Sequence, residues 1–170
     1  MTRTRAESIR FIRKLLVAFI LGLVLSGVTA FPLDAELGAL ANLIGDNHWL
    51  HQLGFAQWIE RILSALVDTY SKYPFIAYGT DWLAFAHLVI AVVFIGPLRD
   101  PVKNIWVIEF GMIACVLVVP FALCAGAFRE IPLGWRLIDC SFGVFGIIPL
   151  WLCHWEIKHL AKQPLQGVAH

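Results

Sequence analysis

The stretch from Thr80 to Phe110 decides the fold, and it reads TDWLAFAHLVIAVVFIGPLRDPVKNIWVIEF. Two apolar runs flank the short polar link at residues 99–104, which is typical of two helices joined by a tight turn. Each run carries one ionisable residue, His87 in the first and Glu109 in the second. Because an ionisable side chain in hydrocarbon is energetically costly, both are candidate functional residues.

The composition of the whole chain differs from that of a soluble domain. The 170 residues are 59% hydrophobic and 15% charged, whereas soluble domains are about 45–50% apolar and about 25% charged. The formal net charge of +1 gives no indication of nucleic-acid binding, and we expect none. The chain is therefore predicted to be an all-α integral membrane protein, with the lipid bilayer as its first partner.

Hydropathy predicts one membrane domain, residues 1–170, with four spans. These are residues 12–31, 80–97, 104–128 and 135–155, which match the roughly 20 residues that a bilayer requires. Residues 32–79, between the first two spans, are mixed in polarity. They hold a short helical pattern ending near Gly45 and an amphipathic helix that Pro74 ends. The expected fold is an antiparallel four-transmembrane-helix bundle with an amphipathic helical cap, residues 32–79.

The first span has an alternative interpretation. Residues 1–30 combine a basic segment, an apolar run and small residues, as a cleaved signal peptide does. We interpret the run as a retained span because its length approaches what a bilayer needs. Gly22 and Ser26 are four residues apart, which favours close approach of a neighbouring helix.

Basic residues divide unevenly between the two sides of the predicted spans. With the N-terminus inside, the inside holds nine of the 13 Lys and Arg residues, namely Arg3, Arg5, Arg10, Arg13, Lys14, Arg99, Lys103, Lys158 and Lys162. The outside holds the others, namely Arg61, Lys72, Arg129 and Arg136. An excess of Lys and Arg marks the cytoplasmic side. We therefore expect two cytoplasmic termini, an extracytoplasmic cap, and a location in a bacterial inner (plasma) membrane.

Local signals predict where the spans begin and end. Thr80 is the expected N-cap of the second span. Asp100 is the expected N-cap of the third, with Pro101 at its first helical position. The polar tail from Glu156 to His170 is expected to be frayed.

Four polar residues are predicted to meet at the outer end of the bundle. Asp81 and His87 lie in the outer half of the second span, and Arg136 and Asp139 in the first two turns of the fourth. We assign His87 and Asp139 as a candidate catalytic acid–base pair. The candidate binding residues are Asp81, Trp82, Trp135, Arg136 and Glu109. In the alternative, structural interpretation, Asp81 caps its helix, Arg136 pairs with Asp139, and His87 bonds to a carbonyl or carboxylate of a facing helix.

Glu109 falls in the inner half of the third span. Its expected partners are His154 on the fourth span or the basic N-terminal residues Arg13 and Lys14. Within a membrane such a carboxyl is expected to be paired or neutral, because an unpaired buried charge is unfavourable.

Cysteines and histidines give weak signals. None of Cys115, Cys124, Cys140 and Cys153 forms a CxxC motif, so we interpret them as packing residues, with a Cys124–Cys140 disulfide as the alternative. His48 and His51 are three residues apart and are weak metal candidates, but we assign no metal and identify no cofactor.

Three classes of function fit these residues. The first is a small ligand-binding or accessory membrane subunit with an outer-facing polar pocket, for a lipid-like ligand or within a larger complex. The second is a membrane enzyme acting on an amphiphilic substrate through His87 and Asp139. The third is an oligomeric proton- or ion-coupled carrier. We favour the first because no established catalytic motif is present.

Overall fold

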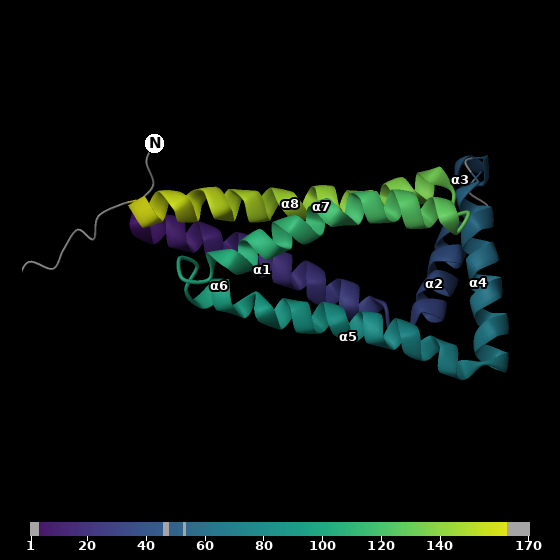
Figure 1. The fold of residues 1–170 in the computed structure, drawn as a ribbon. Coiled ribbons are helices and arrows are strands. Elements are labelled where there is room, and N and C mark those ends of the chain that lie inside the picture. Colours follow the sequence, from purple (N-terminus) through teal and green to yellow (C-terminus); the bar gives the residue numbers. More distant parts are fainter. Residues whose placement is uncertain (1–3, 46–47, 53, 163–170) are drawn as a thin grey trace, which may run out of the picture. The chain divides into compact units, whose positions relative to one another are not determined.

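The computed structural model describes residues 4–45, 48–52 and 54–162, and in these ranges the chain is all-helical without a β-strand (Figure 1). The helices are α1 (Arg5–Thr29), α2 (Leu33–Ile44), α3 (His48–Gln52), α4 (Phe55–Lys72), the 3-10 turn η1 (Pro74–Ile76), α5 (Ala77–Val93), α6 (Ile95–Arg99), α7 (Ile105–Phe128) and α8 (Leu133–Lys162). Within these residues four segments are long and apolar enough to cross a membrane: Arg5–Thr29, Pro74–Arg99, Ile105–Phe128 and Leu133–Lys162. The prediction of four apolar helices is confirmed.

The chain divides into two compact units. Unit 1 takes in Met1–Gly22 and Ala91–His170, and unit 2 is Leu23–Ile90. Unit 1 therefore holds the first part of α1 together with α6, α7 and α8. Unit 2 holds α2, α3, α4, most of α5 and the end of α1.

Helices α7 and α8 pack along most of their length in unit 1. Gly126 of α7 lies against Arg136 of α8, and Gly111 lies against Leu150. Gly143 of α8 lies against the backbone carbonyl of Cys115. In these pairs one residue number rises as the other falls, so the two helices run in opposite directions (Figure 1). Gly111 and Gly143 are therefore close-packing positions of the two helices.

A Schellman turn reverses the chain between α7 and α8. Glu130 adopts a left-handed backbone with φ 58°. Its N–H donates to the carbonyl of Ala127, and the N–H of Ile131 donates to the carbonyl of Gly126 at 2.8 Å. These two bonds satisfy carbonyls that the end of a helix otherwise leaves unpaired. The turn explains how α8 can begin so soon after α7 ends.

The first half of α1 packs beside the last half of α8. The thiol of Cys153 lies 3.8 Å from the carbonyl of Ile12, and Leu16, Ile157 and Leu160 are buried in the same core. The prediction of a frayed tail from Glu156 is therefore wrong as far as Lys162, because this last part of α8 buries apolar side chains against α1. Residues 163–170 of that predicted tail lie outside the described residues.

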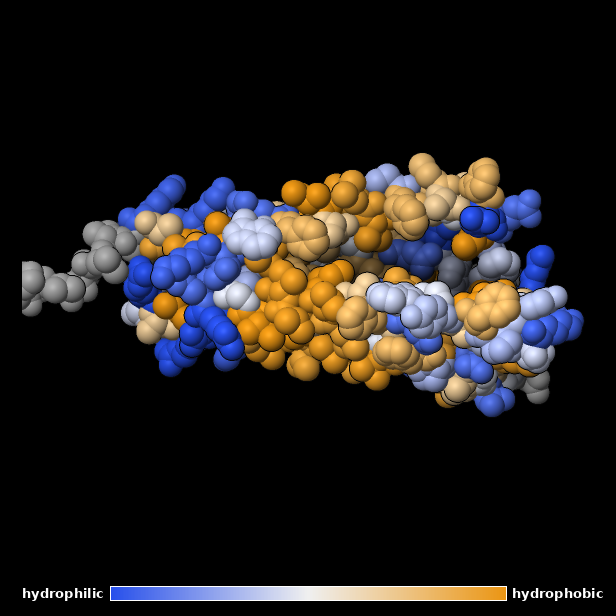
Figure 2. Space-filling model, turned by 60° about the horizontal axis from the view of Figure 1, so that its bottom comes forward, coloured by the Kyte–Doolittle hydropathy of each residue, from blue (hydrophilic) through white to orange (hydrophobic). Residues whose placement is uncertain are grey.

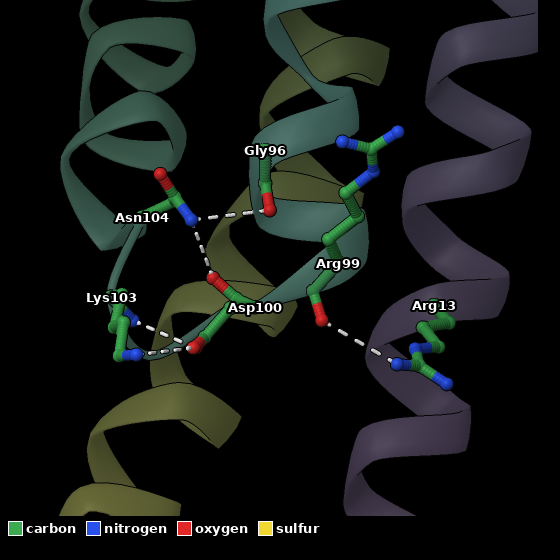
Figure 3. Close-up of polar contacts among 6 residues, drawn as sticks. All are labelled: Arg13, Gly96, Arg99, Asp100, Lys103 and Asn104. Carbon is green, nitrogen blue, oxygen red and sulfur yellow. Dashed lines mark hydrogen bonds and ion pairs between the residues drawn. The ribbon is translucent and has the colours of Figure 1, made fainter.

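The link between α6 and α7 is a turn held by side chains (Figure 3). The Oδ1 of Asp100 accepts the N–H of Lys103 at 3.1 Å. The amide of Asn104 donates to the carbonyls of Gly96 and Asp100, at 3.2 and 2.9 Å. Asp100 therefore stabilises a turn and is not the N-cap of α7 as expected: Pro101 lies in the turn, and Asn104 is the N-cap of a helix that begins only at Ile105. The predicted helix start at Asp100 and Pro101 is wrong because Asn104, as well as Asp100, uses its side chain to stabilise the turn, whereas the predicted span of residues 104–128 nearly coincides with α7.

Unit 2 contains the amphipathic segment. Helix α2 packs on α4, with Leu37 and Ile44 of α2 and Ala56 and Ile59 of α4 buried. Helix α2 ends at Gly45, whose φ of 48° suits glycine. Both predicted helices of residues 32–79 are therefore present.

Two further sequence signals were misleading. Thr80 does not begin its helix, because the η1 turn leads directly into α5 and the Thr80 hydroxyl donates to the carbonyl of Ala77 instead. Gly22 has open space where a side chain would lie, and the close approach occurs at Gly27. A Cβ built on Gly27 would lie 3.0 Å from the carbonyl oxygen of Ala84 on α5.

Candidate functional site

A titratable pair links α7 to α8 in unit 1. The Nε2 of His154 lies 3.0 Å from the Oε1 of Glu109, which is hydrogen-bond distance. His154 is the first of the partners expected for Glu109, and this contact is confirmed. The carboxylate can only accept, so His154 donates from Nε2. The two side chains are close enough to share a proton or to exchange one.

The Glu109 carboxylate lies on an exposed apolar face of α7. Its side chain is 47% exposed, whereas that of His154 is 18% exposed. Trp106 and Ile113 are also exposed and share its face, since they lie three and four residues away along the helix. This face combines a polar anchor with large apolar side chains, as binding surfaces commonly do.

Arg136 lies between α7 and α8 near the Schellman turn. Its aliphatic stem fits over Gly126, where a Cβ would lie 2.5 Å from its Cδ. Its Nη1 donates to the carbonyl of Leu123 at 3.3 Å, and its buried Nε has no hydrogen-bond partner among the described residues. The ion pairs of the described residues do not include Arg136 with Asp139. The expected i,i+3 pairing is therefore wrong, because the guanidinium is drawn to the α7 backbone.

His87 lies in unit 2, where α1 and α5 approach each other. A Cβ on Gly27 would lie 3.1 Å from the Cβ of His87. The His87 Nδ1 lies 2.8 Å from the carbonyl of Leu83, one turn earlier in the same helix. Because a carbonyl only accepts, Nδ1 is the donor of this bond. The expected bond to a facing helix is replaced by a bond within α5.

The remaining residues of the predicted outer cluster are divided between the units. Asp81 and Trp82 belong to α5, and Trp82 is exposed with its ring edge-on to those of Tyr78 and Phe85. Trp135 and Asp139 belong to α8 and are half-buried. Of the predicted outer cluster, Asp81 and His87 lie in unit 2, and Arg136 and Asp139 lie in unit 1. This cluster stays a prediction, and so does the acid–base role of His87 with Asp139.

The weak metal candidates, His48 and His51, have local hydrogen-bond partners. His51 Nε2 lies 3.1 Å from the carbonyl of Gly45, and His48 Nε2 lies 2.8 Å from the amide of Gln52. No group of three His, Cys, Asp or Glu suited to a metal ion occurs among the residues that the structure describes. All four cysteines are free thiols.

Sequence reasoning missed a polar pair between α1 and α8. The hydroxyl of Ser8 donates to the Oε1 of Glu156, and both side chains are buried, at 2% and 5% exposure. A signal was present, since Cys153, Ile157 and Leu160 recur at helical spacing around Glu156 and indicate that the helix continues.

Comparison with protein-family models, with curated proteins and with solved structures finds no match to this chain. The proposals below therefore rest on the residues of this chain and their geometry.

Proposed function

We propose that the protein is inserted in a membrane through its four apolar segments. Only 17–28% of the most apolar 18-residue window of each segment is buried within the protein. Exposed apolar surface on this scale is unfavourable in water, but in a bilayer the acyl chains cover it. Figure 2 shows broad hydrophobic surface beside hydrophilic side chains that gather at the end of unit 1.

The charges of unit 1 support a topology with both termini in the cytoplasm. The side chain of Arg13 on α1 contacts the α6–α7 turn, and that of Arg5 contacts the carbonyl of Leu160 near the end of α8. The basic residues of these three segments therefore gather at one end of unit 1, as the positive-inside rule requires of a cytoplasmic end. In this topology residues 32–79 are the extracytoplasmic cap of an antiparallel four-helix bundle in a bacterial inner (plasma) membrane.

A reporter fused after His170 tests this topology. Fluorescent protein at this position should fluoresce, and alkaline phosphatase should be inactive, because the first folds in the cytoplasm and the second requires export. The same reporters fused after Lys72 should give the opposite result. Active phosphatase at His170 would refute the cytoplasmic C-terminus.

Within the membrane we propose that the protein works by binding, either as an accessory subunit of a larger membrane complex or as a receptor for a lipid-like ligand. The observation that carries this proposal is the position of Glu109, on the exposed apolar face of α7. A carboxylate on a lipid-facing surface is unfavourable unless a further polar group covers it. A second membrane component that lies on this face and bonds to Glu109 removes that penalty.

Native mass spectrometry of the gently extracted protein tests the binding function. We expect the chain to carry additional mass, from a partner chain or from a ligand other than bulk phospholipid. The substitution Glu109→Gln preserves the side-chain volume but removes the charge, and it should weaken binding about tenfold or more, since hydrogen bonds to charged groups contribute about 1.5–3 kcal/mol.

The matched control is Glu60→Gln on the exposed face of α4, which should leave the additional mass unchanged. A bare monomer from wild-type membranes would rule out the binding function. If Glu109→Gln and Glu60→Gln lost the additional mass equally, Glu109 would not be part of the binding site.

A second candidate, an oligomeric proton-coupled carrier, is favoured by the bond between Glu109 and His154. These are two titratable groups in contact inside an apolar segment, an arrangement that proton relays use. The same mass spectra discriminate between the two functions, because the carrier requires that the additional mass be copies of this chain.

A further inference from the structure

The end of unit 1 that carries the α6–α7 turn presents basic side chains from two helices. Arg10, Arg13 and Lys14 lie on α1, Arg99 ends α6, and all four are exposed. Arg13 holds the two helices together, since its Nε and Nη2 lie 3.2 and 3.5 Å from the carbonyls of Leu98 and Arg99. Figure 3 shows the guanidinium groups of Arg13 and Arg99 on the side of the turn that faces α1. We call these four residues the basic cluster.

The carboxylate of Asp100, which directly follows Arg99, is already occupied. The Oδ1 of Asp100 accepts the backbone N–H of Lys103, and its Oδ2 lies 3.6 Å from the Lys103 ammonium. Lys103 therefore neutralises Asp100 within the turn. Among the ion pairs of the described residues, none includes a member of the basic cluster. The positive charge of the cluster is available to a ligand.

Apolar side chains continue from the basic cluster along the same faces of the two helices. Val17 lies one turn after Arg13 on α1, and Ile95 lies one turn before Arg99 on α6; both are exposed. A ligand that fits this surface has an anionic group at one end and hydrocarbon at the other. Guanidinium groups match the oxygens of a phosphate particularly well.

We propose that the basic cluster binds the headgroup of an anionic phospholipid. The lipid phosphate lies between the Arg13 and Arg99 guanidinium groups, with Arg10 and Lys14 beside it, and its acyl chains lie along Val17 and Ile95. Anionic lipids attract basic segments next to membrane spans in this way. The apolar continuation favours a phospholipid over free phosphate, which has no hydrocarbon to place there. This proposal rests on membrane insertion but not on Glu109.

The test uses the purified full-length chain in detergent, with phosphatidylglycerol or phosphatidylcholine of the same acyl chains as probes. Native mass spectrometry counts the bound lipid, and the shift in Tm reports stabilisation. We expect phosphatidylglycerol to be retained in preference to phosphatidylcholine. Arg99→Gln should lower its retention about fivefold, because the substitution removes one charge. Among the described residues no hydrogen bond or ion pair of the Arg99 side chain is lost, since only its backbone carbonyl bonds to Arg13, so the fold should be kept.

The matched control is Arg61→Gln on α4, which removes the same charge from an exposed position whose guanidinium lies 5.8 Å from the Trp58 ring. It should retain phosphatidylglycerol as the wild type does. The double variant Arg13→Gln/Arg99→Gln should lose more than Arg99→Gln alone, with helix content checked by circular dichroism.

Equal retention of the two lipids by the wild type would overturn the proposal, and so would equal losses in Arg99→Gln and Arg61→Gln. Inorganic phosphate is the third probe. If it raises the Tm while phosphatidylglycerol does not, the cluster is a free-anion site and the lipid assignment is wrong. Loss of the Glu109-dependent mass in Glu109→Gln, with phosphatidylglycerol retention unchanged, would show that the two sites are independent.

Discussion

Replacing Gly143 with alanine should destabilise the protein by about 1–3 kcal/mol, the range expected for overpacking a close contact. The added Cβ would overlap the backbone carbonyl oxygen of Cys115 on α7. A backbone atom in the middle of a helix cannot move aside alone, so α7 and α8 must separate along the contact. Unfolding in mixed micelles with increasing dodecyl sulfate measures the loss.

The matched control lies in the same helix. Within the described part of the chain, no neighbouring helix or side chain comes within 4 Å of the position that a Cβ on Gly134 would take. Gly134→Ala should therefore leave the unfolding free energy unchanged or slightly higher, because alanine favours helix over glycine. If both variants unfold alike, the close packing of α7 on α8 at Gly143 does not occur.

Replacing Ser8 with alanine should lower the unfolding free energy by about 1.5–3 kcal/mol, as expected for a hydrogen bond to a charged group. The substitution removes the hydroxyl that donates to the buried carboxylate of Glu156. That carboxylate then stays buried with one donor fewer. The measurement is again unfolding in mixed micelles.

Two further variants isolate this bond. Ser71→Ala removes an exposed hydroxyl that donates to the carbonyl of Asp68 in its own helix, and stability should hardly change. In a Glu156→Gln background Ser8→Ala should be less harmful, because an uncharged acceptor loses less when its donor is removed. The same loss in both backgrounds would contradict the assigned bond.

The apolar helices could be predicted from the sequence because hydropathy over some 20 residues depends little on context. The contact of Glu109 with His154 could also be predicted, since an ionisable group in an apolar helix has few possible partners. The glycines were only partly predictable. Gly22 and Gly27 look alike in the sequence, and only the packing of α1 against α5 shows that Gly27 faces the neighbouring helix.

Helix ends and polar partners were harder to predict because several residues compete for each role. Thr80 and Asp100 are both good caps, yet the η1 turn places Thr80 inside a helix and Asn104 helps to hold Asp100 in a turn. Arg136 has an acid three residues away and bonds instead to the backbone of α7 at Leu123. Such choices depend on tertiary distances, which no local pattern contains.

The bond between Ser8 and Glu156 joins residues 148 positions apart in the chain. At about 5–20 residues per second, a ribosome makes Ser8 about 7–30 s before Glu156. During that time α1 exists without the helix that completes its core. Until α8 is made, the side chains of α1 that pack against it must be covered by other molecules. Because α8 is synthesised last, it is the segment that completes the core of unit 1.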